Sequence, residues 1–180
     1  MAGGTHVSSA QRTAERFAGA WARGDFPAMY SELSASERDR VRRGSFTRAY
    51  QRALETATAE RVVTGRPSHD GEAYRVPVRV ETRLWGPVSG AVRVPISDAG
   101  VSWSRDLVFP GLRRGEKLTR RTRLPPRGTL LARDTTPLAR GPARTSPLGG
   151  VASSITGSLG PIPPDRKADL TARGIPSDAR

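Results

Sequence analysis

Apolar residues recur at helical spacing in the first part of the chain and predict three helices. The first helix stops at Gly24, and Asp25 caps the second. A short polar turn with a capping box of Ser34 and Glu37 follows, and Ser45 caps the third helix. The apolar faces are Ala10, Ala14, Phe17 and Trp21 in the first helix; Phe26, Met29, Tyr30 and Leu33 in the second; and Phe46, Tyr50, Ala53, Leu54 and Ala57 in the third.

After the third helix the pattern changes to alternation with period two, which predicts strands with one buried face. Between Tyr74 and Leu84 the even positions are mostly apolar and the odd positions polar, and Pro77 places this strand at an edge or a bulge. Further strands are predicted for 61–66, 91–96 and 101–109, with turns or breaks at Ser68–Gly71, Gly86–Pro87 and Asp98–Gly100. The fold class is therefore α+β, with three N-terminal helices packed on a curved antiparallel sheet.

Turn-forming residues dominate beyond Leu124, including Pro125-Pro126 and Gly149-Gly150. The apolar runs at 129–131 and 151–155 are too short to build a core alone. We therefore predict an incomplete, loop-rich domain in this part of the chain.

The chain has a net charge of +13, from 30 basic and 17 acidic side chains, and the excess is uneven. Residues 1–110 hold 16 basic and 12 acidic side chains, whereas residues 111–180 hold 14 and 5. Such a charge fits a nucleic-acid binder or a chain facing an anionic surface. Because no aromatic residue follows Phe109 and Pro125-Pro126 interrupts any helix, we interpret Arg113–Arg127 as a solvated connector and predict no nucleic-acid partner.

Few residues offer metal or acid–base chemistry. The chain has no cysteine, which excludes disulfides, Cys-based zinc sites and thiol nucleophiles. His6 and His69 lie in a terminus and a turn without a carboxylate cluster, so we predict surface histidines and no metal. An acid in the pocket of a cone-shaped fold would need an inward strand position, but Glu81 falls on the polar face, and Asp106 is expected to form a surface ion pair with Arg105. We therefore predict no catalytic or cofactor-binding residues and no cofactor.

Serine acyl-transfer chemistry of the penicillin-binding type is also absent from the sequence. That chemistry needs S-x-x-K with S-x-N and K-T-G elsewhere. Arg114 stands three residues before Lys117, Pro164 stands three before Lys167, and no K-T-G occurs. We therefore predict that this chain is not an enzyme. No run of 18 apolar residues predicts a membrane span, and the first residues lack a secretory signal pattern.

Two phrases in the first two thirds of the chain resemble one family. The run A-x-x-F-A-G-A-W-A-R-G-D-F-P-A-M-Y, from Ala14 to Tyr30, resembles the N-terminal non-catalytic domain of class B penicillin-binding proteins of the methicillin-resistance type. That domain has the cone fold of the nuclear transport factor 2-like superfamily. The family phrase W-x-x-x-L-x-F-P-x-L is matched by Trp103, Leu107, Phe109, Pro110 and Leu112.

A third phrase resembles the start of the dimerisation, or pedestal, module of the same enzymes. Arg127–Ala139 keeps the spacing of R-G-x-I-L-D-R-x-G-x-x-L-A, with Ala132 in place of the acid and Thr135 in place of the glycine. The later runs A-S-S-I-T-G-S-L-G-P and A-R-G-I-P-S-D are also similar to pedestal sequence.

The resemblance implies a cone-like domain at 8–110, a basic connector at 111–126 and a partial pedestal at 127–180. It implies a location at the extracytoplasmic face of a bacterial membrane, through an anchor outside this sequence. The role would be to position a transpeptidase domain for peptidoglycan cross-linking, with a link to penicillin binding and the β-lactam response. Partners would be the rest of a class B penicillin-binding protein, and peptidoglycan-synthesis proteins or glycan strands. The alternatives are a basic nucleic-acid-binding protein and a small-molecule-binding cone.

Overall fold

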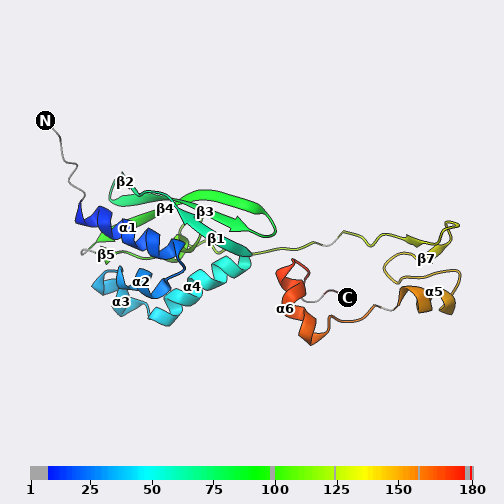
Figure 1. Ribbon diagram of the computed structural model, residues 1–180. Coiled ribbons are helices and arrows are strands. Elements are labelled where there is room, and N and C mark those ends of the chain that lie inside the picture. The colour runs from blue at the N-terminus through cyan, green and yellow to red at the C-terminus, as the bar shows by residue number, and fades with distance from the viewer. Residues whose placement is uncertain (1–7, 98–99, 124, 158, 177–178, 180) are drawn as a thin grey trace. The chain divides into compact units, whose positions relative to one another are not determined.

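The computed structural model describes residues 8–97, 100–123, 125–157, 159–176 and 179. The chain forms two compact units, residues 1–120 and 121–180 (Figure 1). In the first unit, helices precede an antiparallel sheet, which confirms the α+β prediction. The predicted turn at Asp98–Gly100 lies partly on residues that are not described.

From Ser8 to the sheet, the described residues form four helices rather than the predicted three: α1 (Ser9–Ala22), α2 (Phe26–Ser31), α3 (Ala35–Arg40) and α4 (Arg43–Thr56). The additional helix is α3, which had been predicted as a polar turn. The Ser34 hydroxyl accepts from the Glu37 N–H at 3.3 Å and caps α3. The capping box is only half formed, because the Ser34 N–H donates to the Val101 carbonyl at 3.1 Å instead of to Glu37.

The ends of the first helices follow the prediction. Gly24 has a φ of 69° and follows α1, where its N–H bonds the Trp21 carbonyl. Asp25 accepts from the Ala28 N–H at 3.0 Å and caps α2. The prediction for α4 was wrong, since the helix begins at Arg43 and not after Ser45. The Arg42 carbonyl accepts from the N–H groups of Ser45 and Phe46, and this bonding starts the helix early.

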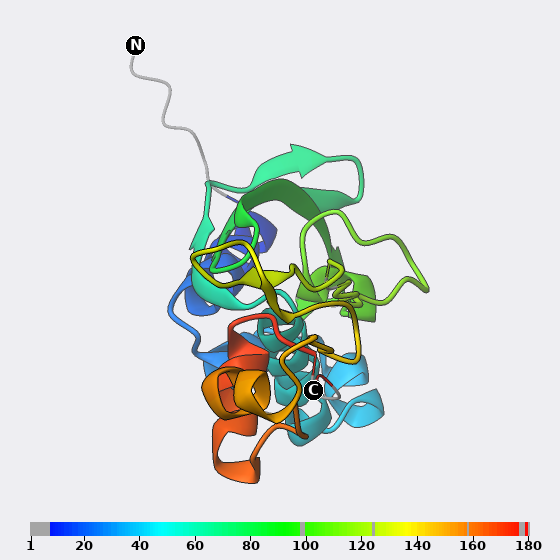
Figure 2. The same cartoon turned by 90° about the vertical axis from the view of Figure 1, so that its right-hand side faces the viewer.

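The sheet contains β1 (Ala59–Thr64), β2 (Ser68–Asp70), β3 (Ala73–Thr82), β4 (Gly86–Ser97) and β5 (Gly100–Val101). The strands are antiparallel in the order β1-β3-β4-β5, with β2 also paired to β3, and the sheet curls into a half-barrel (Figure 2). Two predicted breaks are strand residues instead. Residues 68–70 form β2 because they pair with β3, and Gly86-Pro87 opens β4 because both residues pair with the end of β3.

The predicted strand at 101–109 was wrong beyond Val101. The chain leaves the sheet after Ser102 and forms a 3-10 helix, η1 (Arg105–Val108). Pro77 also departs from the prediction, because it lies in the central strand β3. It is tolerated there because β1 ends at Thr64 and β2 begins at Ser68, so the position lies between the two partner strands.

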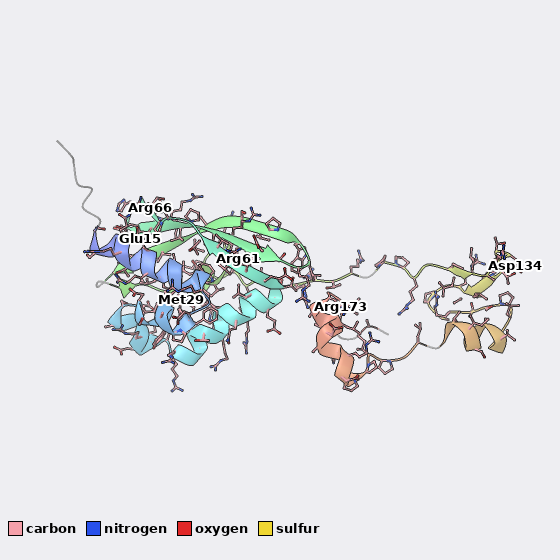
Figure 3. All side chains as sticks on the ribbon, in the orientation of Figure 1. Glu15, Met29, Arg61, Arg66, Asp134 and Arg173 are labelled. Atoms are coloured by element: carbon pink, nitrogen blue, oxygen red, sulfur yellow. The ribbon has the colours of Figure 1, made fainter. Side chains whose placement is uncertain are left out.

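The helices cover the inner face of the sheet (Figure 1). The even positions of β3 from Tyr74 to Thr82 are buried, as the alternation predicted. The largest fully buried side chains include Phe17, Trp21, Met29, Phe46, Tyr50 and Leu107. Between β1 and α1, the Thr64 hydroxyl donates to the Ala18 carbonyl at 3.2 Å, and Arg66 approaches Glu15 of α1 at 3.8 Å (Figure 3).

The second unit contains β6 (Leu130–Leu131), β7 (Pro137–Ala139), α5 (Gly150–Thr156) and α6 (Pro164–Ala172). Strands β6 and β7 form a two-stranded antiparallel sheet. The exposed large hydrophobic residues of the second unit include Leu130, Leu131, Leu148, Val151, Ile155 and Leu159. Among its described residues, the buried hydrophobic side chains are Ala139 and Ala152. The unit therefore has little core of its own, as the short apolar runs predicted.

Candidate functional site

Trp103 marks the point where the chain leaves the sheet. The Ser102 N–H donates to the Pro95 carbonyl at 2.9 Å, next to the short β4–β5 pairing. The Trp103 ring then turns into the core, with its centroid 5.2 Å from that of Phe46. Its Nε1–H donates to the Tyr50 hydroxyl at 3.3 Å. The side chain of Trp103 thus belongs to the helical layer and not to the sheet.

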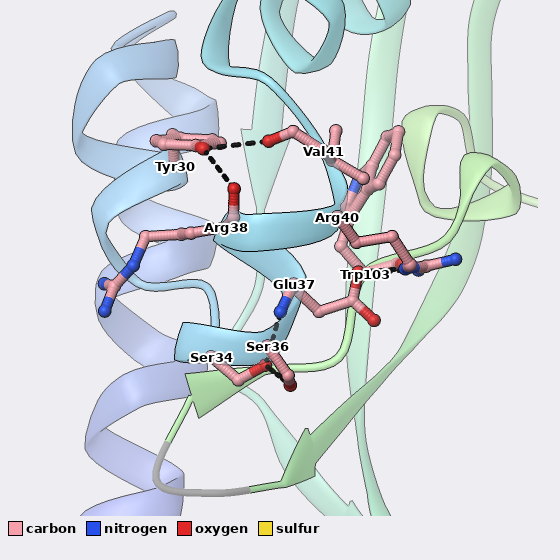
Figure 4. Close-up of polar contacts among 8 residues, drawn as sticks. All are labelled: Tyr30, Ser34, Ser36, Glu37, Arg38, Arg40, Val41 and Trp103. Carbon is pink, nitrogen blue, oxygen red and sulfur yellow. Dashed lines mark hydrogen bonds and ion pairs between the residues drawn. The ribbon is translucent and has the colours of Figure 1, made fainter.

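Helix α3 holds the backbone of the same residue. Arg40 Nη2 donates to the Trp103 carbonyl at 3.0 Å and to Glu37 Oε2 at 2.6 Å (Figure 4). The Tyr30 hydroxyl donates to the Val41 carbonyl at 2.8 Å and fixes the end of α3 (Figure 4). The helix that sequence reasoning missed is therefore the element that anchors Trp103. The capping residue Ser34 indicated a helix start at this position. The bond from Arg40 to Trp103, 63 residues further along the chain, could not be predicted from the sequence.

Tyr50 lies at the centre of this junction and is fully buried. Burial raises the pKa of its hydroxyl far above the usual value near 10, and the hydrogen bond from Trp103 only partly opposes this shift. The phenol is therefore neutral at physiological pH and acts as a packing and hydrogen-bonding group. It is not poised for acid–base chemistry.

The interior of the cone is filled by side chains. Aromatic rings of Trp21, Phe46, Tyr50 and Trp103 pack against one another. Glu81 lies on the polar face of β3, as predicted. Asp106 is half-buried, and the expected ion pair with Arg105 is not among the ion pairs of the described residues.

A first groove of about 470 Å³ lies between α4, η1 and residues 112–118. Its floor is apolar, with Ala53 and Val108 buried. Its cationic lining residues are Arg48, Arg52, Arg105 and Lys117. Glu116 is the acidic lining residue, and one of its oxygens accepts from the Arg113 N–H at 2.8 Å. The groove therefore favours anionic groups.

A second groove of about 800 Å³ lies beside β4, on the other side of the Trp103 segment. It is lined by residues 91–93 and Pro95 of β4, by Gly111–Arg114, and by Ser102, Trp103, Ser104, Asp106 and Leu107. Glu37 and Arg40 of α3 also line it. The segment that leaves the sheet at Trp103 thus creates a groove along the strand that it no longer covers.

The remaining candidates do not gather into a site. His69 is exposed, and its ring lies 5.5 Å from that of Tyr74. His6 falls outside the residues that the structure describes. Within the described ranges, no group of three metal-ligating side chains comes together, and no helix is long and apolar enough to cross a bilayer. The described residues of Arg113–Arg127 form neither helix nor strand.

Helices packed on a curled antiparallel half-barrel define a fold consistent with the NTF2-like class. Residues 9–85 match the family model MecA_N, described as the NTF2-like N-terminal transpeptidase domain. The match covers α1 to the β3–β4 turn, and it confirms the resemblance at the level of this N-terminal domain. No curated protein matches the chain.

Proposed function

We propose that the chain is the non-catalytic N-terminal part of a class B penicillin-binding protein of the methicillin-resistance type. In this role residues 8–110 position a transpeptidase domain for peptidoglycan cross-linking at the extracytoplasmic face of the membrane. The observation that carries the proposal is the match of residues 9–85 to the NTF2-like N-terminal transpeptidase domain.

The packing of the cone supports a mechanical role. Its interior is filled by aromatic side chains that pack against one another. Arg16 also makes two 2.8 Å bonds to the Glu32 carboxylate and joins α1 to the end of α2. A domain whose interior is filled and whose helices are joined by an ion pair is better suited to holding another domain in place than to binding a small ligand.

The second unit supports a further part of the proposal, that residues 127–180 are a partial pedestal module. Leu130, Leu131, Val151 and Ile155 are exposed, although each is a large apolar side chain. In a longer polypeptide these residues would pack against later segments. The basic connector would lie near the anionic cell envelope, where its arginines remain solvated.

Fluorescent penicillin tests the proposal in two preparations. The purified 180-residue chain should remain unlabelled, because it lacks the S-x-x-K serine. Antibodies raised against residues 8–110 should capture, from the membrane fraction of the source bacterium, a longer polypeptide that the penicillin labels covalently.

Two results would contradict the proposal. One is labelling of the purified chain after denaturing electrophoresis. The other is a captured cellular polypeptide that carries residues 8–110 but takes up no penicillin. A lysate treated first with unlabelled penicillin is the control, since it should lose the signal.

A further inference from the structure

Strand β4 has one edge that is paired and one that is mostly open. Its paired edge bonds β3 from Gly86 to Pro95. On its other edge, β5 pairs only with Ile96 and Ser97, and the Pro95 carbonyl accepts from Ser102. The chain that had been predicted to cover the rest of this edge turns away at Trp103. An open strand edge is a template for another strand.

The register at Pro77 shows which main-chain groups of β4 point toward the open edge. The Pro77 carbonyl accepts from the Gly65 N–H at 2.8 Å and therefore points away from β4. Pro77 lies opposite Ala91, so this pair exchanges no hydrogen bonds, and the Ala91 N–H and C=O point away from β3. Alternation gives Ser89 and Arg93 the same orientation. The Ser102 bond to Pro95 agrees with this, because Pro95 has the same parity.

Two prolines limit the open edge. Pro87 and Pro95 point their nitrogens to the same side as Ala91, and neither has an N–H to donate. The open edge therefore comprises Ser89, Ala91 and Arg93, each with one donor and one acceptor. In the part of the chain that the structure describes, the backbone bonds outside helices and strands include none from these three N–H groups.

The second groove gives this edge the shape and charge of a peptide site. Ala91, Arg93 and Pro95 line it together with the segment that begins at Ser102. Its charged lining residues are Arg40, Arg93, Arg113 and Arg114 against Glu37 and Asp106. Arg40 pairs with Glu37, and Arg93 pairs with Asp70 outside the groove. Arg113 and Arg114 are exposed, and no salt bridge involves either among the described residues.

We propose that the open edge of β4 binds an extended acidic peptide segment of a partner protein, which adds to the sheet as a further strand. Main-chain bonds to Ser89, Ala91 and Arg93 would supply the affinity, and acidic side chains would contact Arg113 and Arg114. The groove favours a single strand over a second copy of this sheet, because the Ser102–Leu107 and Gly111–Arg114 segments already line it. The inference stands without the transpeptidase proposal.

Amide exchange in the free chain tests the open edge itself. The N–H groups of Ala91 and Arg93 should exchange quickly, whereas those of Gly90 and Val92, which face β3, should exchange slowly. Equal protection of the two sets overturns the proposal, since the edge would then be covered.

Peptide binding tests the occupant. The probe is the capped heptapeptide Ac-EVEVEVE-NH2, titrated to about 1 mM against ¹⁵N-labelled chain. The amide signals of Ser89, Ala91 and Arg93 should shift. N-methylation of the peptide amides on one strand edge should abolish binding, and N-methylation of those on the other edge should leave it. A lysine peptide of the same pattern should bind at least tenfold more weakly.

Protein variants test the two parts of the site. Ala91→Pro removes an edge N–H at a position of the same parity as Pro87 and Pro95, so the fold should survive, as circular dichroism will check. It should weaken peptide binding at least tenfold, whereas Ser89→Ala keeps the main-chain donor and should change affinity less than twofold. A double change of Arg113→Glu and Arg114→Glu should also weaken binding at least tenfold.

The proposal fails on any of three results. One is the absence of shifts at residues 89–93 with the acidic probe. Another is equal binding of the two N-methylated peptides. The last is a concentration-dependent dimer, seen by sedimentation, in which the Ala91 and Arg93 amides become protected, because a second copy would then be the occupant.

Discussion

Truncation of Trp103 should cost the first unit much of its stability. The side chain is 5% exposed, contacts Phe46 and donates to Tyr50. Trp103→Ala removes this buried ring and leaves a cavity, a change that costs about 3–5 kcal/mol. Domains of this size are stable by about 5–15 kcal/mol. At about 4–8 °C per kcal/mol for a domain near 100 residues, the expected loss in Tm is about 12–40 °C.

The chain contains a matched control for this experiment. Trp85 is 52% exposed in the turn between β3 and β4, so Trp85→Ala should change the free energy of unfolding by less than about 0.5 kcal/mol. Urea unfolding followed by far-ultraviolet circular dichroism measures both variants. A loss below about 1.5 kcal/mol for Trp103→Ala, or equal losses for the two tryptophans, would refute the packing described for the junction.

Three further predictions concern the same unit. Gly100→Ala should destabilise the unit by about 1–3 kcal/mol in urea unfolding, because a Cβ would meet Ser34 Cα at 2.5 Å. Gly44→Ala is the control and should stabilise the unit, because Gly44 lies in a helix and a Cβ there would meet only the flexible end of Arg48. The reverse order of stability would contradict the close approach of β5 to α3. Tyr50 keeps its proton when folded and releases it near pH 10 when unfolded, so the stability that it contributes is present below pH 10 and should fall by about 1.4 kcal/mol per pH unit above it. Tyr50→Phe should remove that slope, and an unchanged slope would contradict the buried phenol. A gel shift at physiological ionic strength should show no DNA or RNA binding tighter than micromolar, and tighter binding whose log affinity falls linearly with log salt would restore the nucleic-acid alternative.

Local patterns predicted the parts of the fold that depend on local chemistry. The alternation from Tyr74 to Thr82 placed the buried face of β3 correctly, because side-chain direction in a strand has period two. Gly24 and Asp25 marked the boundary between α1 and α2, because a left-handed residue and a capping carboxylate act on their immediate neighbours.

The errors arose where a distant contact decides the local structure. Val101, Trp103, Leu107 and Phe109 share the parity of a strand, yet the chain leaves the sheet at Trp103. Its carbonyl accepts from Arg40, and its ring packs against Phe46. The bond between Arg40 and Trp103 cannot be predicted from the sequence around either residue. The open edge of β4 was missed for the same reason, since it depends on the register of Pro77 and Ala91 and on the path of the chain after Trp103.

The central claim is that residues 8–110 position a transpeptidase domain, and one replacement in the cell tests it most directly. In the penicillin-labelled polypeptide that carries this chain, residues 8–110 are replaced by a flexible Gly-Ser linker, and peptidoglycan cross-linking is measured as the dimeric muropeptide fraction when this enzyme is the main transpeptidase. Penicillin labelling should be unchanged, and cross-linking should fall markedly. Unchanged cross-linking with full labelling would show that the domain positions nothing, and loss of labelling would show that the acylation chemistry itself depends on residues 8–110.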